Sequence, residues 1–198
     1  MTNLNRFLFR LVNDAWTSPA LDSCMIFFDS INDYGVVWLV LLGALAALSG
    51  KTGRRAALAG LAAMVVGSAS SEVLKSLVMY PRPFVSLSDV RLLVSPPGSY
   101  SFPSVNATYA FAASSGASLM TRRLLGRLPV WSWGFLALAV AVSYSRVYVG
   151  VHYPGDVLSG AIIGMSLGWL VASIGLRFCQ VEVFDERPTL HNEGDHTG

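Results

Sequence analysis

Three short stretches of the sequence gather residue types that bind and transfer a phosphoryl group. They read KSLVMYPRP from Lys75 to Pro83, PSVN from Pro103 to Asn106, and SRVYVGVHYPGD from Ser145 to Asp156. Burying a phosphate near a membrane is costly unless fixed cations and hydrogen-bond donors surround it. Arginine can hold two phosphate oxygens at once, while lysine acts more as a point charge. We therefore expect the phosphate-binding residues to be Lys75, Arg82, Ser104 and Arg146.

His152 is the candidate nucleophile, because it is the only histidine before the C-terminal tail. Asp156 follows four residues later, and Pro154 between them favours the start of a helix, so the carboxylate can reach the imidazole. Such a pairing fixes one tautomer and leaves the other ring nitrogen free to attack phosphorus. The alternative is a structural histidine, the commoner role of a lone histidine in a membrane protein. Ser104 has an alternative role too, as a simple helix N-cap, and its two roles can coexist.

The composition predicts an all-α membrane protein of one domain. Hydrophobic residues make up 53% of the 198 residues and charged residues only 13%, whereas soluble domains usually carry about a quarter charged residues. Five apolar stretches approach the roughly 20 helical residues that a bilayer crossing needs. They are residues 34–49, 54–79, 103–121, 129–149 and 154–178. A sixth stretch, residues 19–32, is shorter and contains Asp22 and Asp29.

The positive charges favour counting the sixth stretch as a span. Lys and Arg residues of the loops and ends fall on one side of the membrane only if residues 19–32 also cross it. These charges are Arg6, Arg10, Lys51, Arg54, Arg55, Arg122, Arg123, Arg127 and Arg177. The interpretation is a polytopic bundle of six transmembrane helices with both termini inside.

Three regions follow from this interpretation. Residues 1–18 have apolar side chains at helical spacing and are expected to form an amphipathic interfacial helix. Residues 19–179 are expected to form the six-helix membrane domain. Residues 180–198 are polar and are expected to be a disordered cytoplasmic tail.

This topology places the connection 80–102 and the turn 146–154 together on the outer face. Outer loops should be poor in Lys and Arg, yet three arginines lie there. They are Arg82, Arg91 and Arg146. For Arg91 the favoured explanation is a snorkelling interfacial cation. Glu72 lies one helical turn before Lys75 and is expected to be the charge partner that makes this lysine tolerable inside a helix.

Taken together, the three stretches resemble the signatures of the type 2 phosphatidic acid phosphatase family, which is related to bacterial acid phosphatases and vanadium haloperoxidases. The first signature is matched by Lys75, Arg82 and Pro83, and the third by Ser145, Arg146, His152 and Asp156. The second is matched by Pro103 and Ser104 but ends in Asn106, where the family has histidine.

The resemblance implies a membrane phosphatase that needs no metal or other cofactor. In such an enzyme His152 attacks phosphorus to give a phosphohistidine, Asp156 orients the imidazole, and the cations stabilise the charged transition state. The residue at position 106 belongs to the catalytic set, because the family histidine there is thought to protonate the leaving oxygen. The carboxylates expected on the outer face do not have metal-ligand spacing.

Asn106 can donate a hydrogen bond but cannot deliver a proton. Loss of general acid catalysis typically costs about 10²- to 10⁴-fold, and less when the leaving group needs little protonation. A lipid diphosphate expels a lipid monophosphate, so Asn106 suits a diphosphatase better than a monoesterase. The rival explanation is that Asn106 marks a disabled enzyme, whether natural or engineered.

The expected function is hydrolysis of the terminal phosphate of a lipid (di)phosphate, such as undecaprenyl diphosphate or phosphatidylglycerol phosphate. The alternative is a non-catalytic binder or carrier of lipid phosphates. A haloperoxidase is disfavoured, because those relatives are soluble. The expected partners are the lipid substrate and membrane lipids, without an obligate protein partner, and the net charge of +2 does not suggest nucleic acid. The expected location is a bacterial inner membrane, with the site on the periplasmic or extracellular face.

Overall fold

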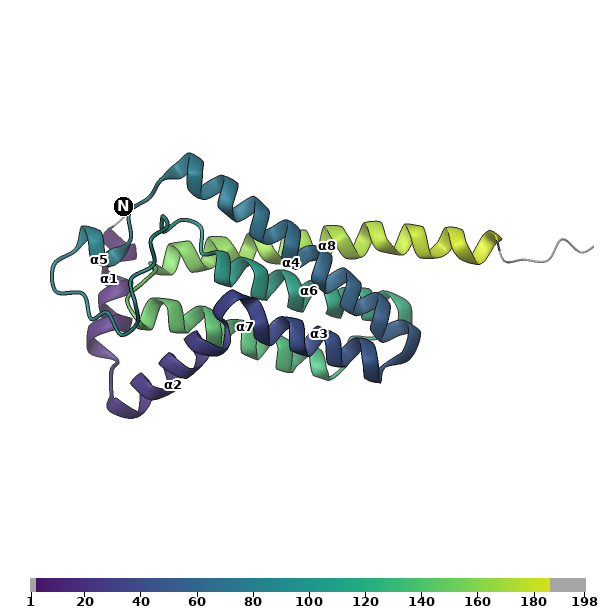
Figure 1. Ribbon diagram of the computed structural model, residues 1–198, viewed down its shortest axis with the longest axis horizontal. Helices are drawn as coiled ribbons and strands as arrows, with labels where there is room; N and C mark the ends of the chain where they lie inside the picture. Colours follow the sequence, from purple (N-terminus) through teal and green to yellow (C-terminus); the bar gives the residue numbers. More distant parts are fainter. Residues whose placement is uncertain (1–2, 186–198) are drawn as a thin grey trace, which may run out of the picture.

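The computed structural model describes residues 3–185, and within this range its regular structure is entirely helical. The α-helices are α1 (Asn3–Arg10), α2 (Pro19–Ile31), α3 (Val36–Leu48), α4 (Gly50–Val78), α5 (Pro83–Ser86), α6 (Val105–Leu125), α7 (Trp131–Tyr148) and α8 (Pro154–Asp185). A π-helical turn, Leu11–Ala15, follows α1, and a 3₁₀ turn, Asp33–Gly35, lies between α2 and α3. The long helices lie roughly side by side, and α1, α5 and the connection before α6 gather at one end (Figure 1). The expected all-α class is confirmed.

The expected count of six membrane spans is not confirmed. Among the described residues, two stretches are long and apolar enough to cross a membrane, Gly50–Ser86 and Pro154–Arg177. A third span results when α2 and α3 are taken together, although they meet at a 50° bend. At about 1.5 Å per residue, neither of these 13-residue helices alone crosses a hydrocarbon core of about 30 Å. Residues 19–32, expected to form a span of their own, therefore correspond to α2, the first of two helices that together make one bent span.

The bend between α2 and α3 is held by side chains from its neighbours. Tyr34 and Gly35 both have positive φ angles there, 54° and 72°. Asn32 accepts a hydrogen bond from the indole nitrogen of Trp38 at 3.0 Å, and its carbonyl accepts one from the hydroxyl of Tyr109. These contacts fix the bend against α3 and α6.

The N-terminal helix lies at the same end of the bundle as the turn between α7 and α8, which contains His152. The side chain of Asn5 accepts a hydrogen bond from the backbone N–H of Gly155 at 2.9 Å, and the ring of Phe9 packs edge-on against Tyr153. The arginines of this segment, Arg6 and Arg10, predict the opposite face for the N-terminus, and the structure differs from that expectation. In the structure the guanidinium of Arg10 pairs with Asp14 at 3.0 Å and donates to the carbonyls of Ser88 and Asp89, in the connection before α6.

Asn13 connects this N-terminal segment to the end of α7 and to the connection before α6. Its buried side chain donates hydrogen bonds to the carbonyls of Arg91 (2.9 Å) and Tyr148 (2.8 Å), and it accepts one from the N–H of Arg91 at 3.0 Å. The segment is therefore an integral part of the fold. At the other end of the chain, α8 continues to Asp185, beyond the expected start of the tail at residue 180. The remaining tail residues, 186–198, lie outside the described residues.

Helix α6 is the centre of the bundle, packing against α4, α7 and α8. Its buried face is rich in alanine, which lets neighbouring backbones approach closely. Gly164 of α8 shows how close: a Cβ atom there would lie 2.3 Å from the carbonyl oxygen of Thr108 and 2.9 Å from the amide nitrogen of Ala112. This contact fixes α8 against the N-terminal half of α6, and both helices begin at the candidate site.

Replacing Gly164 with Ala is expected to destabilise the fold by about 1–3 kcal/mol, because the added methyl group forces two packed backbones apart. Gly43 of α3 is the matched control, since a Cβ there meets nothing within 4 Å. Gly43→Ala is expected to be neutral or slightly stabilising, as alanine has the higher helix propensity. Thermal unfolding in detergent checks both variants. Equal melting temperatures for the two would contradict the close contact.

Candidate active site

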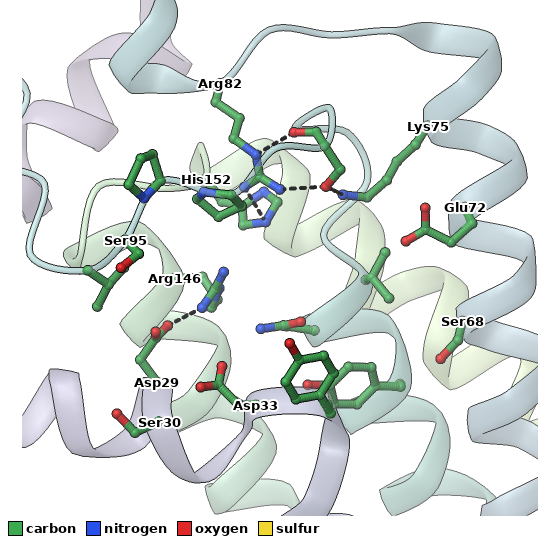
Figure 2. Close-up of a pocket in the computed structure, with 18 of the residues that line it drawn as sticks. Asp29, Ser30, Asp33, Ser68, Glu72, Lys75, Arg82, Ser95, Arg146 and His152 are labelled. Atoms are coloured by element: carbon green, nitrogen blue, oxygen red, sulfur yellow. Dashed lines mark hydrogen bonds and ion pairs between the residues drawn. The ribbon is translucent and has the colours of Figure 1, made fainter.

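A cavity of about 810 Å³ lies at the site end of the bundle, and Figure 2 shows its lining. Its walls come from the bend between α2 and α3, from α4, and from the connection before α6, together with the start of α6 and the end of α7. Five of the predicted site residues line it, namely Lys75, Arg82, Asn106, Arg146 and His152. Ser104 and Asp156 are buried next to these residues and are absent from the lining. The structure therefore brings the three sequence stretches together.

The His152 side chain is buried between a cation and a carboxylate. Its Nε2 atom lies 3.1 Å from Nη1 of Arg82, and its Nδ1 atom lies 3.5 Å from Oδ2 of Asp156. A guanidinium can only donate, so Nε2 must be the acceptor and the proton belongs on Nδ1, facing the carboxylate. The lone pair of Nε2 thus accepts the hydrogen bond from Arg82 at the cavity.

Asp156 is fixed by several donors. Its Oδ2 atom accepts hydrogen bonds from the backbone N–H of Tyr153 at 2.9 Å and from the hydroxyl of Ser101 at 2.5 Å. The carboxylate also lies in the first turn of α8, where the helix dipole favours a negative charge. Ser101 is fully buried and was missed by the sequence analysis. Its closeness to PSVN in the sequence is the only signal that could have found it.

Burial lowers the pKa of the His152 imidazole to well below its usual value of about 6.5. The hydrogen bond with Asp156 acts in the opposite direction, and the nearby charges of Arg82 and Arg146 lower this pKa further. A lowered pKa means that the imidazole is neutral at and below pH 7. The group is therefore in the form that can act as a nucleophile.

Lys75 and Arg82 are both held by the connection that leads to α6. Arg82 donates from Nε to the carbonyl of Ser99 (2.7 Å), from Nη2 to the Ser99 hydroxyl (3.1 Å), and from Nη1 to the carbonyl of Val151 (2.8 Å). The ammonium of Lys75 donates to the same hydroxyl (3.1 Å) and to the carbonyl of Tyr100 (2.7 Å). Ser99, also missed by the sequence analysis, thus joins the two cations.

Glu72 lines the same cavity one turn before Lys75 (Figure 2). The hydrogen bonds of the Lys75 ammonium go to the connection before α6, so these contacts give no support to the expected pairing with Glu72.

Ser104 and Asn106 lie at the start of α6 in different surroundings. Ser104 is the N-cap: its hydroxyl accepts a hydrogen bond from the N–H of Ala107 at 3.4 Å, and its own N–H donates to the carbonyl of Asp156 at 3.1 Å. It therefore joins α6 to the residue that faces His152. Asn106 is half-buried and lines the cavity.

Two arginines pair with aspartates of α2. Arg146 in the last turn of α7 forms a buried ion pair with Asp29, which also lines the cavity. Arg91 is bound to Asp22 at 2.7 Å and stacks over the ring of Tyr148, with 5.3 Å to the ring centroid. The snorkelling interpretation of Arg91 was therefore wrong, because the charge is satisfied within the protein.

The chain is similar to a known protein family and to solved structures. Residues 56–178 match the PAP2 superfamily. The chain is 34% identical over 171 residues to an undecaprenyl-diphosphatase of Sulfolobus acidocaldarius, covering 84% of this chain and 76% of that protein. It is similar to the crystal structure of Aquifex aeolicus LpxE (TM-score 0.67, 28% identity, 87% and 96% of the two chains).

A second solved structure is a PAP2-type phosphatidylglycerolphosphate phosphatase from Bacillus subtilis. It has a TM-score of 0.66 and 25% identity, with coverage of 89% of this chain and 88% of that one. The family match covers more than half of the chain and includes Lys75, Arg82, Asn106, Arg146 and His152, the predicted residues that line the cavity. The chain therefore belongs to the PAP2 superfamily, and it is a membrane lipid phosphatase.

Proposed function

We propose that this lipid phosphatase removes the terminal phosphate of a lipid diphosphate, with undecaprenyl diphosphate as the first candidate, through a phosphohistidine at His152. The observation that carries this proposal is the position of His152. Its Nε2 lone pair lies at a cavity that is lined by three cationic side chains, and its Nδ1 atom faces a fixed carboxylate. This combination is what in-line attack on a phosphoryl group requires.

The reaction then has two steps. Arg82 first exchanges its hydrogen bond with Nε2 of His152 for one with a phosphoryl oxygen, which frees the Nε2 lone pair. Nε2 then attacks phosphorus, the bond from phosphorus to the bridging oxygen breaks, and the electron pair of that bond leaves with the lipid monophosphate. Water next attacks phosphorus, the P–Nε2 bond breaks with its electron pair returning to Nε2, and both protons of the water leave with the inorganic phosphate. Lys75, Arg82 and Arg146 stabilise the charge on the phosphoryl oxygens in both steps. Asp156 stabilises the positive charge that the imidazole gains, because it faces Nδ1.

Asn106 supports a diphosphate over a monophosphate substrate. It lines the cavity as an amide, which can donate a hydrogen bond to the leaving oxygen without protonating it. A phosphate leaving group needs less protonation than an alkoxide. The cavity of about 810 Å³ also has room for a head group larger than one phosphate. The Sulfolobus relative, an undecaprenyl-diphosphatase, agrees with this choice, and phosphatidylglycerol phosphate is the second candidate because of the Bacillus structure.

We place the protein in a bacterial inner membrane with the cavity on the periplasmic or extracellular face. Two basic clusters support this orientation, one at the start of α4 and one at the end of α6, both at the end of the bundle opposite the cavity. Such clusters favour the cytoplasmic side. The exposed apolar side chains of α1, Leu4 and Phe7, support an interfacial position for this helix at the cavity end.

A substrate panel tests the proposal. The purified protein in detergent is expected to release phosphate from undecaprenyl diphosphate, and to do so faster than from undecaprenyl phosphate, phosphatidic acid or phosphatidylglycerol phosphate. The rate is expected to persist in EDTA, because no step proposed above uses a metal ion. Saturable binding of these lipids without any phosphate release would instead favour the alternative of a non-catalytic lipid-phosphate binder or carrier. Faster release from a monophosphate would contradict the diphosphate assignment.

A further inference from the structure

Asp29 is an acidic residue in the wall of a cavity that is proposed to bind phosphate. It lies on α2 and is 5% exposed, and its carboxylate accepts a hydrogen bond from Nη1 of Arg146. A carboxylate in such a place repels a phosphoryl group unless its charge is balanced. Figure 2 shows Asp29 and Arg146 facing each other across the wall, so the balance comes from this arginine.

Arg146 keeps other donors after pairing with Asp29. A guanidinium has five N–H donors in one rigid plane. Nη1 is bound to Asp29, whereas Nε is buried and, among the described residues, has no hydrogen-bond partner. Buried donors are rarely left unpaired, and Arg146 lines the cavity, so the unpaired donor indicates that the guanidinium lacks an acceptor. Arg146 is thus held at Nη1 and lines the cavity with hydrogen-bond donors to spare.

We infer that Asp29 is a positioning residue: it holds Arg146 by Nη1 so that the remaining guanidinium donors face the phosphoryl oxygens. The inference rests on the proposed function, because the expected acceptor is the transferring phosphoryl group. The physical reason is conformational entropy: a long arginine side chain loses much rotamer freedom when it is fixed in one position, and this loss opposes substrate binding if it occurs at that moment. An existing ion pair orders it before the substrate binds. The guanidinium then needs no rearrangement in the transition state.

A second ion pair of α2, between Asp22 and Arg91, provides a control. It distinguishes an effect on the position of Arg146 from a general effect on the packing of α2. Asp22 lies seven residues before Asp29, two helical turns away on the same face of α2. It accepts hydrogen bonds from Arg91 (2.7 Å) and from the hydroxyl of Tyr148 on α7 (2.7 Å). Asp22 therefore also docks α2 against the end of α7, but it does not touch Arg146.

Three variants test the inference: Asp29→Ala, Asp29→Asn and the matched control Asp22→Asn. Asp29→Ala is expected to lower kcat about 10²-fold, with a smaller change in KM, because a misplaced catalytic group costs about this much. Asp29→Asn keeps an oxygen acceptor for Nη1 and is expected to recover part of the loss. Asp22→Asn is expected to lower the melting temperature while kcat stays within a few-fold of the parent.

Binding of orthovanadate and of inorganic phosphate, followed by calorimetry in detergent, gives a readout that does not depend on turnover. Asp29→Ala is expected to weaken orthovanadate binding more than phosphate binding, since vanadate can adopt the geometry of the transition state. A loss of kcat for Asp29→Ala no larger than that for Asp22→Asn would show a docking role only and overturn the inference. Tighter phosphate binding by Asp29→Ala with unchanged kcat would overturn it too, because Asp29 would then be a competitor of the phosphoryl group.

The two proposals can fail separately. A parent chain that binds both anions but hydrolyses no lipid phosphate would refute the proposed function. The binding experiments with the Asp29 variants would still decide whether Asp29 positions Arg146.

Discussion

Replacing His152 with Gln is expected to reduce phosphate release from a lipid diphosphate by about 10⁴-fold, because the nucleophile is removed. Glutamine is close in size and can still accept a hydrogen bond from Arg82, so the cavity should keep its shape. The parent protein, quenched in base during turnover, is expected to carry an acid-labile phosphate. The His152→Gln protein is expected to carry none. Phosphate release and the labelled phosphoprotein are the two measurements.

An unchanged melting temperature is the control for the His152→Gln protein, since it shows that the lost rate is not lost folding. Ser101→Ala provides a comparison of a different kind. It removes a hydrogen bond to Asp156 while leaving the imidazole in place, so its rate is expected to fall much less. Retention of more than a tenth of the parent rate by His152→Gln would contradict the assignment of the nucleophile.

Replacing Asn106 with His is expected to raise the rate on a lipid monophosphate by about 10²- to 10⁴-fold, because an imidazole at this place can protonate the departing alkoxide. On the matching lipid diphosphate the gain is expected to be much smaller, since the leaving monophosphate needs little protonation. Phosphate release from the two substrates, measured side by side with the same lipid chain, checks both expectations.

Asn106→Gln is the matched control for this substitution, because it changes the length of the side chain without adding a group that can donate a proton at neutral pH. It is expected to give no gain on either substrate. Equal gains of Asn106→His on the monophosphate and the diphosphate would contradict the leaving-group explanation. Such a result would instead favour the interpretation of Asn106 as the mark of a disabled enzyme.

The chemistry of the site could be predicted from the sequence because it depends on side-chain types at short spacings. His152 and Asp156 lie four residues apart around the start of α8, so local geometry alone brings them near each other. Lys75 and Arg82 flank the end of α4 in a similar way. Each of these pairs lies at one end of one helix. Such an end can be recognised in the sequence from a proline next to a stretch of apolar residues.

The partners of these residues could not be predicted in the same way. Ser99 binds both Lys75 and Arg82, partly through its backbone carbonyl, and a carbonyl carries no sequence signal. Ser101 looks like any other serine of a loop until the path of the chain brings it to Asp156. The path of this connection depends on its docking against the turn after α7, where the N–H of Leu93 donates to the carbonyl of Val149 at 3.2 Å.

The sequence by itself determined an all-α membrane protein and a set of cations, a histidine and a carboxylate suited to phosphoryl transfer. These follow from composition, periodicity and local spacing, which act within one helix or one turn. Only the tertiary structure decided that the N-terminal helix lies at the site end, that α2 and α3 form one bent pair, and that Asp29 meets Arg146. These two residues are 117 positions apart, and their contact exists because α2 docks against the end of α7, which no local pattern encodes.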